Sequence, residues 1–198
     1  MPLISHKLKL IFAHVPKTSG ATIKSVMLKL DPNCEQIGAY HSPITKELSN
    51  KYPEYYKFII VRTSFKIISS RYRFTYTHKG KYKEPPVGHP SFKEWLLNIN
   101  DSHIKYGAPG SVCNQHYYYL DDSNKLLVDQ IIDYDQLENG IKELNKKTGN
   151  KLDLSIVKKS HYYGEYDWKS IYDKETIEIV KNICNFDIDY FKWEIPEI

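Results

Sequence analysis

The chain has 198 residues, of which 41% are hydrophobic and 26% charged, a balance that is ordinary for a soluble globular protein. This length fits a single domain over residues 1–198 with a substantial core. The formal net charge of +4 is a mild excess that suits an anionic ligand and does not by itself indicate nucleic acid.

Targeting and redox signals are sparse. No signal peptide is seen, and no apolar run approaches the roughly 20 residues that a membrane-spanning helix needs. Cys34, Cys113 and Cys184 lie far apart and form no C-x-x-C pair, which favours reduced thiols. No metal-ligand spacing appears. We therefore expect a cytoplasmic protein with no membrane span and no metal.

Strand and helix patterns alternate along the chain. We expect strands over Leu8–Ala13, Phe58–Val61 and within Leu126–Tyr134. Helices are expected over Ala21–Leu30, Thr45–Lys51, Phe65–His78, Ser91–Ile99, Val112–Leu120, Leu137–Lys147 and Asp173–Asn185. Loops are expected over Lys79–Pro90, Asp101–Gly110 and Lys151–Tyr166. The alternation predicts an α/β fold in which helices flank a central, mostly parallel sheet.

The first strand leads into a loop that has the composition of a phosphate cradle. The apolar run Leu8–Ala13 breaks at Pro16-Lys17-Thr18-Ser19-Gly20, and helical spacing resumes from Ala21. Loop amides and a helix N-terminus offer aligned N–H donors, and a lysine adds a full positive charge. Hydroxyl donors are supplied by Thr18, Ser19 and Thr22. An ordinary strand-to-helix turn remains the alternative.

The order of residues in this loop differs from that of a nucleoside-triphosphate P-loop. The P-loop pattern G-x-x-x-x-G-K-[ST] places its lysine after the second glycine. Here Lys17 precedes Gly20, and no glycine lies upstream in the loop. The loop is therefore an anion cradle of a different type.

A second anion-binding element follows the next strand. Phe58–Val61 is a buried-type strand, and Arg62 stands at its carboxyl end, where open α/β sheets bind ligands. Ser70 lies about two turns into the following helix. An arginine and a serine in these places can converge on one more phosphate.

Together these elements resemble the sulfotransferases that use 3′-phosphoadenosine-5′-phosphosulfate (PAPS) as donor. The loop Pro16–Gly20 is similar to their 5′-phosphosulfate loop, and Arg62 with Ser70 is similar to their 3′-phosphate element. The branch of carbohydrate O-sulfotransferases is the most similar. The resemblance implies a single-domain, P-loop-like sulfotransferase fold, PAPS as donor, its product 3′,5′-adenosine bisphosphate (PAP), and an acceptor hydroxyl, with a carbohydrate favoured.

The resemblance also implies roles for individual residues. The donor-binding residues would be Pro16, Lys17, Thr18, Ser19, Gly20, Ala21, Thr22, Arg62 and Ser70. His41 would be the general base, and Lys17 would stabilise charge on the departing phosphate. Asn114 and Gln115 would lie near the substrate.

The chain departs from the family pattern at three places. Thr63-Ser64 replaces a usual Asp/Asn-Pro, Ile67 replaces a second arginine with Lys66 next to it, and Ala21 replaces a hydroxyl residue. These departures bear on the contacts to the donor.

Three other interpretations stay open. One is a nucleotide or small-molecule kinase with an unusual phosphate loop, since Thr18 does follow Lys17. Another is a non-catalytic nucleotide-binding protein. The third is a nucleic-acid-binding protein, because basic and aromatic residues interleave over 71–83, although we expect no nucleic-acid partner. Among the other histidines, His116 is the strongest competitor of His41 for the role of base.

Overall fold

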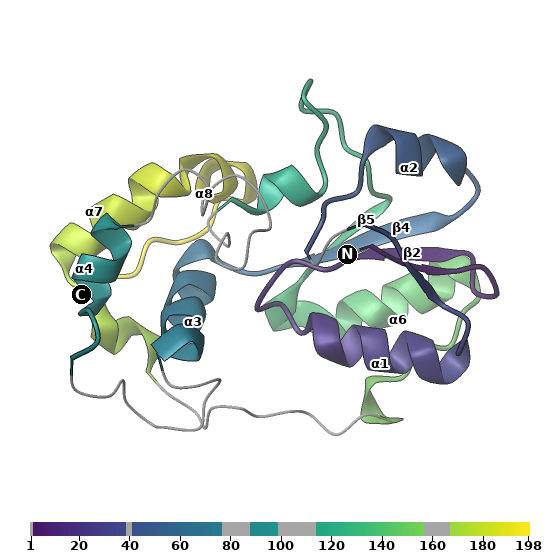
Figure 1. Ribbon diagram of the computed structural model, residues 1–198, viewed down its shortest axis with the longest axis horizontal. Coiled ribbons are helices and arrows are strands. Elements are labelled where there is room, and N and C mark those ends of the chain that lie inside the picture. Colours follow the sequence, from purple (N-terminus) through teal and green to yellow (C-terminus); the bar gives the residue numbers. More distant parts are fainter. Residues whose placement is uncertain (1, 39–40, 77–87, 99–113, 157–166) are drawn as a thin grey trace. The chain divides into compact units, whose positions relative to one another are not determined.

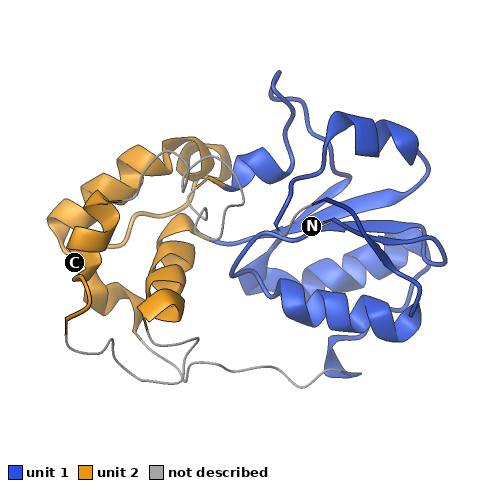
Figure 2. Cartoon of the chain, viewed as in Figure 1, with its two compact units in different colours: residues 1–62, 115–159 blue, residues 63–114, 160–198 orange. Residues whose placement is uncertain are grey.

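The computed structural model describes residues 2–38, 41–76, 88–98, 114–156 and 167–198 (Figure 1). The chain forms two compact units (Figure 2). Residues 1–62 and 115–159 make the first, and residues 63–114 and 160–198 make the second. The single-domain organisation expected from the sequence stays a prediction.

The first unit is built on a five-stranded sheet with the order β3-β1-β2-β4-β5. The strands are β1 (Leu3–Ser5), β2 (Leu10–Ala13), β3 (Glu35–Gln36), β4 (Tyr56–Val61) and β5 (Gln130–Asp133). The neighbours β2, β4 and β5 run parallel, whereas β1 is antiparallel to both β2 and β3. The predicted α/β class is confirmed, and the expectation of a mostly parallel sheet holds only for the half made of β2, β4 and β5.

Helices cover both faces of this sheet (Figure 1). On one side lie α1 (Gly20–Leu30) and α6 (Leu137–Thr148), and on the other lies α2 (Lys46–Lys51). Three 3₁₀ turns complete the unit: η1 (Gln115–Tyr118), η2 (Tyr134–Gln136) and η3 (Leu154–Ile156).

The core of the first unit lies between the sheet and the pair α1 and α6. Phe12 of β2 stacks on Phe58 of β4 with ring centroids 5.1 Å apart. These rings belong to a buried cluster with Met27 of α1 and Leu144 of α6. Burial of large apolar side chains on both helices ties them to the parallel strands, and so sets where the strand ends and the α1 N-terminus lie.

The second unit is helical over its described residues. It contains α3 (Ser64–Tyr76), α4 (Phe92–Leu97), η4 (Trp168–Ile171), α7 (Lys174–Ile183) and α8 (Asn185–Phe191). Its core is aromatic: Tyr172 donates from its hydroxyl to the Phe65 carbonyl at 2.6 Å and meets the Phe92 ring edge-on at 5.0 Å. Tyr72 packs against Phe92 and Trp95 in the same cluster.

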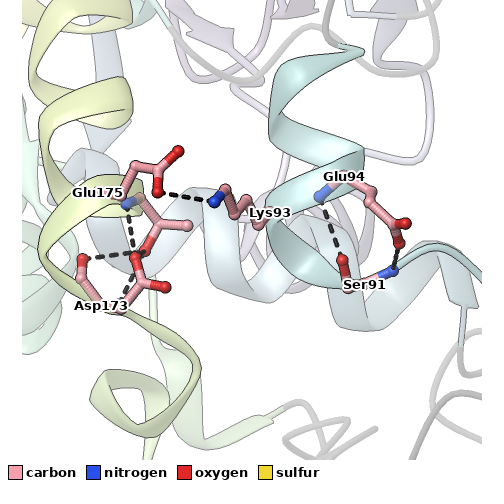
Figure 3. A network of polar contacts seen from close by, with 6 residues as sticks. Ser91, Lys93, Glu94, Asp173 and Glu175 are labelled. Carbon is pink, nitrogen blue, oxygen red and sulfur yellow. Dashed lines mark hydrogen bonds and ion pairs between the residues drawn. The ribbon is translucent and has the colours of Figure 1, made fainter.

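Capping side chains fix where two of these helices begin (Figure 3). Ser91 and Glu94 form a capping box at the start of α4, as the sequence predicts. Asp173 forms the corresponding box at the start of α7. Lys93 of α4 pairs with Glu175 of α7 at 2.6 Å. Local hydrogen bonds thus satisfy the first amides of each helix.

Several element boundaries differ from the expected ones. Over the described residues 114–120, the helix expected at Val112–Leu120 is replaced by the short 3₁₀ turn η1. The helix expected over Asp173–Asn185 ends at Ile183, before a separate helix, α8. The segments 77–87, 99–113 and 157–166 lie outside the described residues, with the expected loop Asp101–Gly110 among them.

Candidate anion-binding site

The loop between β2 and α1 has an unusual backbone. Lys17 and Ser19 have φ angles of 65° and 62°, and Thr18 between them is outside the left-handed region. Alternation of this kind is a backbone pattern that can turn successive N–H groups toward one side, as in a nest that binds an anion. Thr18 is fully buried, and its hydroxyl donates to the Val15 carbonyl at 2.8 Å. This side chain therefore braces the loop.

The first turn of α1 begins at the end of this loop. Ser19 is the N-cap residue but makes no side-chain capping hydrogen bond, and no acidic residue lies in the first turn. Thr22 and Ile23 donate their amides to the Ser19 carbonyl at 2.9 and 3.2 Å. The partial positive charge of the helix N-terminus is thus not offset by a local carboxylate, which favours an anion at this place.

The structure brings His41 to the loop. Its Nδ1 lies 3.1 Å from the carbonyl oxygen of His14, the residue that follows β2, and only 8% of the residue is exposed. His41 has a φ of 61°, a left-handed conformation that few side chains adopt. The predicted base is thus held beside the lysine loop although 24 positions (41 − 17) separate it from Lys17.

His14 is a site residue that the sequence did not single out. Its ring meets the ring of His41 at a centroid distance of 4.6 Å and an angle of 64°. The same ring fills the space beside Gly20, where an added Cβ would lie 1.7 Å from His14 Cδ2. The only signal in the sequence was its place, between the apolar run of the strand and Pro16.

The electrostatic state of His14 follows from its surroundings. Burial first, and the neighbouring His41 second, lower the pKa of His14 to about 3. The ring is therefore neutral near pH 7. It contributes shape and dipoles to the site, and no charge.

Arg62 stands at the same edge of the sheet. Since β2 and β4 are parallel neighbours, their carboxyl ends meet there. The Arg62 guanidinium lies over the Tyr134 ring at 4.3 Å from its centroid. The Arg62 Nε atom is buried, and no residue in the described part of the chain accepts a hydrogen bond from it. A partly buried cation of this kind is suited to an anionic ligand.

Gln115 fixes the main chain of Arg62. Its Oε1 accepts from the Arg62 amide at 2.9 Å, and its Nε2 donates to the Arg62 carbonyl at 2.7 Å. The side chain is fully buried. These two hydrogen bonds give Gln115 a positioning role at the end of β4, and its expected contact with a substrate stays a prediction.

Two expected site residues belong to the second unit. Ser70 lies on α3 and is 6% exposed, and Asn114 is 8% exposed. The described residues supply no hydrogen-bond partner for Asn114 Oδ1. The pairing of Ser70 with Arg62 stays a prediction, as does the contact of Asn114 with a substrate.

The remaining loop residues and histidines lie as follows. Pro16 is buried, Ala21 is exposed and Thr22 is half-buried. His116 is half-buried on η1 and packs against Tyr117, with ring centroids 4.2 Å apart. His78, His103 and His161 lie outside the described residues.

These features define the class of the first unit. It is an α/β unit with a lysine-bearing loop, left-handed at Lys17 and Ser19, and an arginine at the carboxyl edge of its parallel strands. Comparison of the chain with family models, with curated proteins and with solved structures found no match. In the part of the chain that the structure describes, no helix is long and apolar enough to cross a membrane.

Proposed function

We propose that the protein transfers a sulfuryl group from PAPS to an acceptor hydroxyl, with a carbohydrate as the favoured acceptor class. The observation that carries the proposal is the hydrogen bond from His41 to His14 at the start of the lysine loop. This contact holds His41, the candidate base, beside the candidate anion cradle, which supports the role that the resemblance to PAPS-dependent sulfotransferases implies. In sulfuryl transfer the acceptor oxygen, the sulfur and the leaving oxygen lie nearly in line. The group that takes the acceptor's proton must therefore lie close to the loop that binds the donor.

The loop would hold the 5′ end of the donor. The nest at Lys17 to Ser19 and the N-terminus of α1 offer N–H groups to the 5′-phosphate. Lys17 would stabilise the negative charge that grows on the bridging oxygen as the sulfur–oxygen bond breaks. The Thr18 hydroxyl is engaged by Val15, so Ser19 and Thr22 are the better candidates for hydroxyl contacts.

His41 would take the proton of the acceptor. The carbonyl of His14 can only accept a hydrogen bond, so the proton of a neutral His41 sits on Nδ1 and Nε2 carries the lone pair. As the acceptor oxygen forms its bond to sulfur, its proton passes to Nε2 and PAP departs. The imidazolium then returns this proton to solvent.

Arg62 would hold the 3′-phosphate and so distinguish PAPS from ATP. Its buried Nε and its place over Tyr134 support this role. Gln115 would act through Arg62 by fixing its main chain. The role of Ser70 rests on the sequence spacing alone.

The burial of Thr18 counts against the kinase alternative. In a P-loop kinase the hydroxyl residue after the lysine holds Mg²⁺. Here that hydroxyl donates to the Val15 carbonyl inside the loop. No observation on the described residues favours a nucleic-acid partner.

Transfer of radioactive sulfate from labelled PAPS to a panel of sugars, phenols and alcohols tests the proposal. His41→Asn keeps a residue type that tolerates a φ of 61°, and it removes the base. We expect this variant to lower transfer by about 10²–10⁴-fold and to leave PAP affinity unchanged. His116→Asn is the matched control and should retain transfer. Full activity of His41→Asn would refute the assignment.

A further inference from the structure

We propose that His14 is a positioning residue for His41, a role that rests on the proposed function. Its main-chain carbonyl selects which nitrogen of His41 carries the proton, and its ring holds that carbonyl and the His41 ring against the loop. His14 would act only through His41 and would not touch the reacting atoms.

The carbonyl contact determines the tautomer. His41 Nδ1 lies 3.1 Å from the His14 oxygen, a distance typical of a neutral N–H to carbonyl hydrogen bond. A carbonyl has no proton to give, so only the tautomer protonated at Nδ1 can make this contact. The lone pair of the neutral ring is thereby assigned to Nε2, on the other side of the imidazole.

The His14 ring is fixed from three sides. It stacks on Phe12 of β2 with centroids 6.0 Å apart, meets the His41 ring at 4.6 Å, and fills the space beside Gly20. Phe12 belongs to the buried core of the first unit. Through His14, the place of His41 is thus tied to the core and to the first residue of α1.

The backbone of His41 shows that its place is imposed by its surroundings. A histidine with a φ of 61° is in a sparsely populated conformation, and such conformations persist only where contacts hold them. The hydrogen bond and the ring contact with His14 are two contacts of this kind. The His14 carbonyl makes the first contact and the His14 ring makes the second, and both act on His41.

The charge state of His14 fits the same role. Burial first, and His41 second, lower the pKa of His14 to about 3. A neutral ring can stand beside His41 while His41 becomes a cation during transfer, whereas a second imidazolium would oppose that step. Of the two rings, His14 is therefore the one that stays neutral, and the proton of the acceptor is left to His41.

Nitrogen NMR of histidine-labelled protein without nucleotide tests the inference directly. We expect the neutral form of wild-type His41 to be protonated at Nδ1. A wild-type His41 protonated at Nε2 would overturn the proposal, whatever the variants do. Since no donor or acceptor is present, this readout is independent of sulfuryl transfer, and failure of the proposed function would appear separately as a lack of PAP binding.

Two variants test the contribution of the ring. His14→Ala keeps the carbonyl but removes the ring that holds it, and we expect the Nδ1-to-Nε2 proton ratio of His41 to fall by about fivefold or more, the equivalent of one hydrogen bond. His14→Phe keeps a ring of similar shape and should retain the ratio. An unchanged proton ratio in His14→Ala would overturn the role of the ring. A ratio that falls equally in His14→Ala and His14→Phe would also overturn it.

Discussion

Lys17, Ser19 and His41 share a left-handed backbone, with φ angles of 65°, 62° and 61°. Each such residue costs roughly 1–2 kcal/mol relative to the right-handed form. Strain of this kind is found where a site must hold its groups in one arrangement. At the residue scale, the backbone of these three residues is therefore held by tertiary contacts, because local preference opposes it.

Titration of His14 should make stability depend on pH. Its pKa is lowered to about 3 in the folded protein by burial and by His41, whereas an unfolded histidine titrates near 6.5. Between these values the unfolded chain binds more protons, so stability is lost as pH falls from about 6.5 toward 3, by up to about 1.4 kcal/mol per pH unit. Urea denaturation over this range should show the slope.

The variant His14→Phe provides the matched comparison, because it removes the titrating group and keeps a ring. Its denaturation curve should depend less on pH than that of the wild type over the same range. Stability at neutral pH, measured alongside, separates packing effects from titration. Identical slopes in the two proteins would contradict the neutral state of His14 in the folded protein.

Gln115→Ala should weaken the end of β4. The substitution removes two hydrogen bonds and leaves the Arg62 amide and carbonyl without these partners. We expect a loss of about 2 kcal/mol in unfolding free energy and weaker binding of PAP. Gln115→Glu keeps the acceptor but sets a second oxygen against the Arg62 carbonyl at a buried position, so it should not restore the loss. A loss below about 0.5 kcal/mol, typical of surface substitutions, would show that Gln115 does not fix this strand end.

Only some of the candidate site residues could be predicted from the sequence. Lys17, His41 and Arg62 were singled out because charge and order along the chain are visible in a linear pattern. His14 was missed, since its role depends on the packing of its ring beside Gly20 and His41, which no spacing encodes. The sequence predicted Gln115 near the substrate, but it could not show the hydrogen bond to Arg62, because the two residues lie 53 positions apart.

At the scale of elements, apolar runs and breakers predicted most of the first unit. The strand Phe58–Val61 and the helix Ala21–Leu30 appear with shifts of one or two residues at their ends, as β4 and α1. The strand β1 was missed because Leu3–Ser5 is too short for an alternating pattern. Its antiparallel pairing with β2 is what makes the sheet mixed.

Gly140→Ala tests the packing of α6 on β5. In a helix interior this change usually stabilises by up to about 1 kcal/mol. Here the new Cβ would lie 2.3 Å from Ile132 Cγ2 and 3.2 Å from Ile132 Cβ. We therefore expect a destabilisation of about 1–3 kcal/mol, measured by chemical denaturation.

A double-mutant cycle identifies the cause. Ile132→Ala removes the two closest atoms, Cγ2 at 2.3 Å and Cγ1 at 3.1 Å, and keeps only the Cβ at 3.2 Å, so the Gly140→Ala penalty should shrink by about 1 kcal/mol or more in that background. Gly149→Ala is the control for a glycine substitution without a packing clash. An added Cβ there meets nothing within 4 Å, and the φ of 71° is the only source of strain. Additive effects of the substitutions at 140 and 132 would contradict this packing.

For the whole molecule, sequence reasoning described one continuous domain, and the contacts divide the chain into two compact units. The first unit includes Arg62, which follows β4, and the second unit begins at Thr63. A linear pattern cannot show it, because α3 has the same amphipathic spacing whichever core it joins. Lys17, His41 and Arg62 belong to the first unit, whereas Ser70 and Asn114 belong to the second.

Calorimetric binding of PAP, with ADP as the control, tests whether the loop and Arg62 form a PAPS site. ADP retains the adenosine and a 5′ anion and lacks the 3′-phosphate. If the loop and Arg62 form the donor site, PAP should bind more tightly by roughly 2–4 kcal/mol, the contribution of one or two charge-assisted hydrogen bonds. Equal binding of the two nucleotides, a preference for ADP with Mg²⁺, or binding of neither would contradict the account.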